Sequence, residues 1–143
     1  MTGIDDHKRR INEHISALKD AFDAGLSGKP VTVGFHCSAC AVEMLEFYLH
    51  KSQKIDAGRT VKHDWFKRPA PGQKTAPLVE RNMPVSFPRK DEVYGLIYTI
   101  EENRNMLVYG KSLESQVRTV FESFMKLKGI LAELLDEEGE TIG

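Results

Sequence analysis

The sequence lacks several features that would place it quickly in a class of proteins. It contains only two cysteines among 143 residues, which argues against a disulfide-stabilised secreted domain. No stretch approaches the roughly 20 apolar residues of a membrane-spanning helix, and no apolar run near the amino terminus resembles a signal peptide. There is also no internal repeat at solenoid periods. We therefore expect a single cytoplasmic domain over residues 1–143, without a membrane partner.

An excess of charge of one sign is also absent. Twenty Lys and Arg residues face 21 Asp and Glu residues, which gives a formal net charge of -1. The chain thus has no global basic signature of a nucleic-acid-binding protein, and binding to nucleic acid would need a local patch. What is present is 41% apolar residues, enough for a core that folds without disulfides.

Four long stretches carry apolar residues at helical spacing. The first runs from Ile4 to about Leu26, the second from Val31 to Ser52 and the third from Asp91 to Tyr109. Ser112 is a candidate cap for the fourth, which has the cleanest apolar stripe. That stripe comprises Leu113, Val117, Val120, Phe121, Phe124, Leu127, Leu131, Leu134 and Leu135.

A short helical segment and a proline-rich loop separate the second and third stretches. Thr60 is placed to cap a short helix over Val61–Phe66. Five of the six prolines then fall between residues 68 and 89, where apolar periodicity stops, which indicates a long irregular loop. The pattern predicts an all-α, up-and-down bundle of four long helices plus a short helix, and its long apolar faces favour a homodimer.

Arg104 is the residue least explained by its own helix. It continues the apolar stripe that runs from Val93 to Ile100, where a leucine-like side chain is expected. A guanidinium there must be paired, or must line a cleft or a subunit interface, because an unpaired buried charge is strongly destabilising. An ion pair with Glu101, one turn earlier, or a side chain that extends to solvent is the simpler explanation.

Cys37 and Cys40 form a Cys-x-x-Cys pair. If the β-branched segment Val31–Phe35 were a strand, the pair would stand where thioredoxin-like proteins carry their redox site. No alternating strands follow, however, and cysteines three apart on a buried helix are usually small apolar fillers. We favour the filler interpretation.

The histidines offer two candidate chemistries, a zinc site and acid–base catalysis. A zinc site would have to combine the two cysteines with His36, His50 or His63, and no second ligand pair has the usual spacing, so we expect no metal and no cofactor. His63-Asp64 suggests acid–base chemistry, but neighbouring helical residues point in different directions. A structural histidine is the simpler interpretation.

The segment around Arg104 resembles a family signature. Residues 104–110 read Arg-Asn-Met-Leu-Val-Tyr-Gly. This is similar to the Arg-Asn-x-Leu-Val-His-Gly motif of the HEPN superfamily (higher eukaryotes and prokaryotes nucleotide-binding), with Tyr109 at the position of the histidine. Residues 41–49 and the His63-Asp64 pair resemble the family more loosely.

The resemblance implies an all-α dimer. Many HEPN proteins are metal-independent ribonucleases of toxin or defence type, and some act beside a nucleotidyltransferase. In such members the arginine stabilises the phosphorane and the histidine transfers the proton of the ribose 2′-hydroxyl at the dimer cleft.

Since Tyr109 replaces the histidine, we expect binding of RNA or a nucleotide through Arg104, Asn105 and Lys111. A ribonuclease with Arg104 and Tyr109 as catalytic residues, or with His63 in place of the missing histidine, is the alternative. A non-catalytic partner of a nucleotidyltransferase is a further one.

Overall fold

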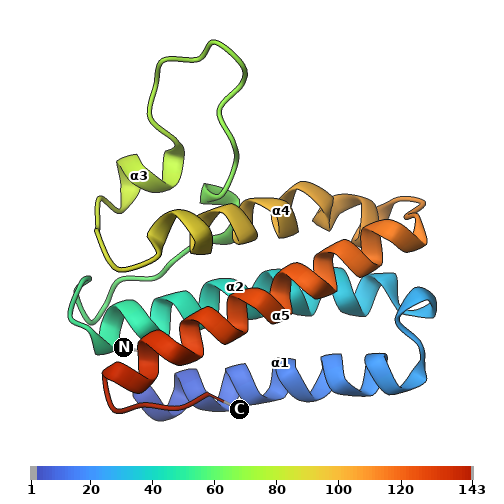
Figure 1. Ribbon diagram of the computed structural model, residues 1–143, viewed down its shortest axis with the longest axis horizontal. Helices are drawn as coiled ribbons and strands as arrows, with labels where there is room; N and C mark the ends of the chain where they lie inside the picture. The colour runs from blue at the N-terminus through green and yellow to red at the C-terminus, as the bar shows by residue number, and fades with distance from the viewer. Residues whose placement is uncertain (1–2, 143) are drawn as a thin grey trace.

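Four long helices form a bundle in the computed structural model, which describes residues 3–142. They are α1 (Ile4–Ala24), α2 (Pro30–Lys51), α4 (Lys90–Tyr109) and α5 (Glu114–Glu137), and they run side by side in alternating directions (Figure 1). The described range contains no strand, so the all-α prediction is confirmed and the strand alternative for Val31–Phe35 is wrong. Within the same range, no helix has the length and apolar character needed to cross a membrane.

The central helix of the bundle is α2, which packs against α1, α4 and α5. Pro30 occupies its first turn, where a missing amide proton costs no hydrogen bond. Burying each large apolar side chain contributes roughly 1.5–3 kcal/mol, so this helix holds much of the core energy. The fully buried apolar residues of α2 are Val33, Cys37, Cys40, Ala41, Met44, Leu45, Phe47 and Leu49.

The apolar stripe of α5 faces the core as predicted, although its start differs. Val117, Phe124 and Leu131 are buried, whereas Leu113 is 66% exposed and precedes the helix. Ser112 does not cap α5. Instead, the backbone N–H of Leu113 donates to Oε1 of Gln116 at 2.8 Å. A side chain of the first turn of α5 thus accepts this N–H, as in one half of a capping box.

The short helical elements differ from the prediction. Residues 61–66 contain only a 3₁₀ turn, η2 (His63–Trp65), because Phe66 leaves the helical conformation. A short helix, α3 (Leu78–Asn82), forms instead inside the proline-rich stretch, directly after Pro77, whose ring fixes a φ of -54°. This stretch extends away from the bundle beside α4 (Figure 1).

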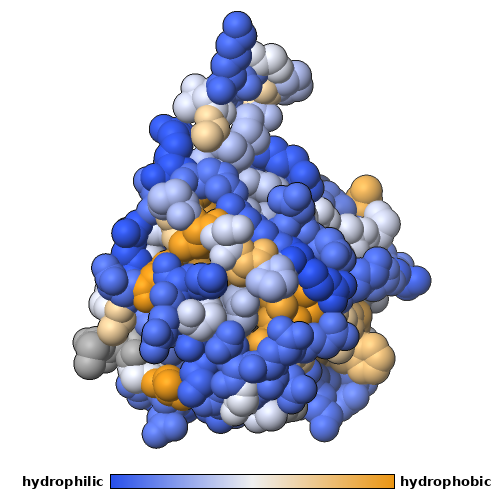
Figure 2. Space-filling model, turned by 60° about the vertical axis from the view of Figure 1, so that its left-hand side comes forward, coloured by the Kyte–Doolittle hydropathy of each residue, from blue (hydrophilic) through white to orange (hydrophobic). Residues whose placement is uncertain are grey.

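The carboxyl-terminal end of α4 lies very close to the beginning of α2. A Cβ added to Gly34 would come within 2.8 Å of the Leu107 Cβ and 3.2 Å of a Val108 methyl group. A glycine is therefore needed for this approach of the two helices. The opposite end of the bundle, brought forward in Figure 2, has a mostly hydrophilic surface with hydrophobic residues in separate spots.

Candidate functional site

A cavity of about 450 Å³ lies beside the second half of α4. We call it the Arg104 cavity. It brings together Arg104 and Asn105 from the predicted site with the His63-Asp64 pair, which lies far away in the sequence. The residues that line it are His63, Asp64, Phe66, Lys67, Arg68, Glu101, Glu102, Arg104 and Asn105.

Phe66 fixes the loop side of the cavity. Its side chain is 2% exposed and its ring packs edge-on against the rings of Tyr94 and Tyr98, with centroid distances of 5.3 and 5.9 Å. Aromatic pairs in this geometry contribute about 0.5–1.5 kcal/mol beyond the burial of their area. Because Phe66 directly follows η2, this anchor holds His63 and Asp64 against α4.

Glu101 is held at both oxygens by residues outside its own helix. Its Oε1 lies 2.7 Å from Nδ1 of His63, and its Oε2 accepts a hydrogen bond from the hydroxyl of Ser38 on α2. The simpler explanation for Arg104, an ion pair with Glu101, is therefore wrong. With the Glu101 carboxylate as acceptor, His63 carries its proton on Nδ1 and keeps a lone pair on Nε2.

Arg104 has an unsatisfied donor. Its Nε is buried and has no hydrogen-bond partner among residues 3–142, while its Nη1 donates to the side-chain oxygen of Asn105 at 3.3 Å. Buried N–H groups are nearly always paired in folded proteins. Arg104, which lines the cavity, thus keeps a buried donor without a partner.

Arg68 is already engaged on the other side of the cavity. Its Nε donates to Glu102 at 3.0 Å, and its guanidinium stacks over the ring of Tyr98 at 5.1 Å. The cations Lys67, Arg68 and Arg104 face the carboxylates of Asp64, Glu101 and Glu102. The cavity is consequently rich in donors while its formal charges balance when His63 is neutral.

Two predicted site residues lie elsewhere. Tyr109 is 78% exposed, Lys111 is exposed, and neither lines the Arg104 cavity. Gly110 adopts an extended conformation, with φ -110° and ψ -167°, so the chain leaves α4 directly after Tyr109. The structure therefore places Arg104 at one cavity with His63 and leaves Tyr109 outside that cavity.

The two cysteines are buried and free. Burial raises the pKa of Cys37 well above its ordinary value, with the neighbouring Cys40 adding to the shift. Burial and then the charge of Glu43 raise the pKa of Cys40 to about 12. A thiolate is thus disfavoured at both positions, which agrees with apolar fillers and disagrees with a redox pair.

A larger hollow of about 620 Å³ lies between α4 and α5. Three of its charged residues already bind one another: Arg89 donates to Glu92 at 3.1 Å and to Glu133 at 2.8 Å. It offers no buried polar group without a partner. We therefore place the candidate site at the Arg104 cavity, although it is the smaller of the two.

One grouping of polar residues was missed by the sequence analysis. His7 from α1 lies beside Glu46 and His50 from α2, and one ligand atom of each lies within 4.8 Å of the others. The four-residue spacing of Glu46 and His50 on one helix face was a usable signal. The contribution of His7, 39 positions before Glu46, was not visible in the sequence.

Comparisons test whether known proteins share these features. Searches against protein-family models, curated proteins and solved structures gave no match.

Proposed function

We propose that this protein is a HEPN-like helical domain that binds RNA or a nucleotide by a phosphate group in the Arg104 cavity. The buried, unpartnered Nε of Arg104 carries the proposal. A guanidinium binds phosphate oxygens through two parallel N–H groups, so a phosphate would satisfy Nε and one terminal nitrogen together. Asn105 and Lys67 supply further donors at the same cavity.

The balance of charges around the cavity determines how strongly this binding depends on salt concentration. Because cationic and anionic side chains match around the cavity, few counterions are released when a phosphate enters. Affinity then depends on the geometry of the donors more than on net charge. We expect a shallow dependence of the dissociation constant on salt concentration, unlike that of a protein with a basic patch.

Exposed apolar residues support a dimer at this end of the bundle. Phe35 on α2, Met106 and Tyr109 on α4, and Leu113 after it are 44–78% exposed. The contact between Gly34 and Leu107 places the two helix ends together. Covering these side chains with a second copy would bring a second Arg104 near the first, as the HEPN resemblance implies.

The binding proposal is tested by titrating labelled single-stranded RNA and nucleotides into the protein. Arg104→Ala should weaken binding at least about tenfold, since hydrogen bonds to charged groups contribute about 1.5–3 kcal/mol. The matched control is Arg118→Ala, which removes an exposed arginine from α5 and should leave affinity unchanged. Sedimentation of the same samples measures the dimer. Absence of binding, or equal losses in both variants, contradicts the proposal.

A second candidate function, metal-independent cleavage of RNA, is favoured by the contact between His63 and Glu101. Glu101 orients the ring by its Nδ1–H, as the acidic member of a catalytic triad does, and leaves Nε2 to accept the proton of a ribose 2′-hydroxyl. The 2′-oxygen attacks phosphorus and the P–O5′ bond breaks. The products are a 2′,3′-cyclic phosphate and a 5′-hydroxyl, whose proton comes from water. Arg104 stabilises the phosphorane.

Cleavage is tested with labelled RNA in the presence of EDTA. His63→Gln should lower the rate by about 10²–10⁴-fold, the usual contribution of a positioned general base. Tyr109→Phe is the control, and it should cleave at the wild-type rate because Tyr109 lies outside the cavity. Loss of cleavage in Tyr109→Phe would transfer the role to the tyrosine. A wild-type protein that binds RNA without cleaving it rules out this second candidate alone.

A further inference from the structure

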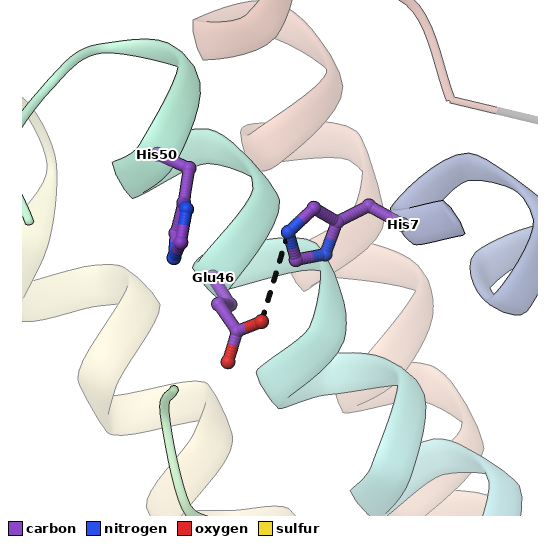
Figure 3. A group of neighbouring side chains, drawn as sticks. All are labelled: His7, Glu46 and His50. Atoms are coloured by element: carbon purple, nitrogen blue, oxygen red, sulfur yellow. Dashed lines mark ion pairs between the residues drawn. The ribbon is translucent and has the colours of Figure 1, made fainter. Parts of the chain in front are cut away.

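Three side chains with metal-binding groups converge where α1 begins and α2 ends. His7, Glu46 and His50 place one ligand atom each within 4.8 Å of the others, and Nε2 of His7 lies 3.7 Å from Oε2 of Glu46 (Figure 3). Figure 3 shows the Glu46 carboxylate between the two rings. None of the three residues lines the Arg104 cavity.

His7 presents a buried nitrogen without a partner. Its Nδ1 lies 2.9 Å from Oε1 of Glu43, which accepts the Nδ1 proton and leaves a lone pair on Nε2. The His7 side chain is 1% exposed, and its Nε2 makes no hydrogen bond within the described range. The ring of Phe47 stacks on it at 5.7 Å and shields it from water.

His50 and Glu46 are oriented in a similar way by the loop that follows α2. The Nε2–H of His50 donates to the carbonyl oxygen of Arg59 at 2.7 Å, so Nδ1 keeps the lone pair. The backbone N–H of Val61 donates to Oε1 of Glu46 at 2.6 Å, which leaves Oε2 on the side of His7. All three candidate ligands therefore have the outer contact that typically orients metal-binding residues.

We propose that His7 through Nε2, Glu46 through Oε2 and His50 through a ring nitrogen bind a divalent cation of the zinc type. Two imidazoles and a carboxylate are a known ligand set for Zn²⁺ and leave a fourth position for water. Zn–N and Zn–O bonds of about 2.0–2.2 Å separate two tetrahedral ligands by roughly 3.4 Å, near the 3.7 Å between His7 and Glu46. Mg²⁺ and Ca²⁺ need more oxygen ligands than this cluster offers.

The half-buried position of His50 provides the route to solvent, since His7 and Glu46 are both buried. A cation bound here would link the first helix to the last turn of α2 and, through Arg59 and Val61, to the loop. The competing state is an imidazolium of His7 held between Glu43 and Glu46, which needs no metal.

The test is a titration of the purified, chelator-dialysed full chain with Zn²⁺ alone, followed by calorimetry and by thermal unfolding. Wild-type protein should bind one equivalent and unfold at a higher temperature with Zn²⁺ than without it. His50→Gln should weaken binding at least about tenfold, since even outer-contact changes cost 10–100-fold. Gln keeps an amide that can donate to the Arg59 carbonyl, so this variant should stay folded.

The matched control is His36→Gln, which disrupts the other close histidine pair, His14 and His36, with Nδ1 atoms 2.9 Å apart. It should bind Zn²⁺ as wild type does. Co²⁺ in place of Zn²⁺ adds a spectroscopic readout, a visible absorption of tetrahedral ligation that should be lost in Glu46→Gln. Absence of stoichiometric binding, unchanged binding in His50→Gln, or loss of binding in His36→Gln would each overturn the proposal.

Discussion

Two histidines of this protein are held in the same way and placed in opposite surroundings. Nδ1 of His7 lies 2.9 Å from Glu43, and Nδ1 of His63 lies 2.7 Å from Glu101. The His7 side chain is 1% exposed, whereas that of His63 is 43% exposed at the Arg104 cavity. The shared contact fixes the tautomer of both rings, and burial decides what the remaining nitrogen does. The buried one suits ligation and packing, and the open one suits proton exchange.

The largest expected effect of this difference in burial is on the unfolding free energy of variants that lack His7 or His63. His7→Ala leaves a hole beside Phe47 and removes a buried partner of Glu43 and Glu46, so we expect a loss of about 3–5 kcal/mol in unfolding free energy. His63→Ala should lose less than about 1 kcal/mol, since its ring is partly solvated. Urea denaturation of both variants measures the contrast. Equal losses would mean that the two histidines share a single structural role.

Substitution of Gly34 should affect binding at the Arg104 cavity without affecting binding at the His7, Glu46 and His50 cluster. Gly34→Ala places a Cβ 2.8 Å from that of Leu107, and such overpacking costs about 1–3 kcal/mol. It should displace the end of α4, weaken phosphate binding at Arg104 and leave Zn²⁺ affinity at His7 unchanged. The control is Gly129→Ala in α5, where the added Cβ meets open space and should raise stability by up to about 1 kcal/mol. Parallel loss of both binding activities would contradict two independent sites.

The smallest expected effect concerns pH. Burial alone would raise the pKa of Glu43, but hydrogen bonds from His7 and Arg10 outweigh it, and its pKa in the folded state is lowered. The unfolded chain, with a glutamate pKa of about 4.3, then takes up this proton first as the pH falls. The stability that Glu43 contributes is therefore complete above about pH 4.3 and is lost below it, through the lowered pKa. Chemical denaturation at several acidic pH values gives the unfolding free energy as a function of pH. This free energy should fall less steeply with decreasing pH in Glu43→Gln than in the wild type, and an equal steepness refutes the prediction.

Much of the bundle was predictable because helical periodicity is a local signal. The structure confirms the four long helices, and α2 packs against the other three. The first stripe is buried in part only, since Ile11 and Leu18 are buried while Phe22 is 59% exposed. Arg104 was also identifiable, since it breaks its own stripe. Short elements were less predictable. Five residues after Pro77 form α3. Residues 61–66 follow a better predicted cap, Thr60, but form only the 3₁₀ turn η2, after which Phe66 is buried.

The partners of the site residues could not be predicted, because they depend on contacts distant in sequence. Glu101 was expected to bind Arg104 one turn away, yet it binds His63, 38 positions earlier, and Ser38 on α2. The same holds for His7 and Glu46, which no spacing rule connects. The exposed position of Tyr109 follows from the extended backbone at Gly110, where the sequence motif only indicates that a helix ends.

The two contacts of Glu101 also determine the rotational phase of α4. An α-helix turns by about 100° per residue, so Arg104, three positions after Glu101, projects only about 60° away from it around the axis. Because one carboxylate oxygen is held by α2 and the other by the loop, α4 cannot rotate about its own axis without breaking a contact. Two inserted residues between Glu101 and Arg104 would place the guanidinium about 140° from Glu101 around the axis and point it away from the cavity.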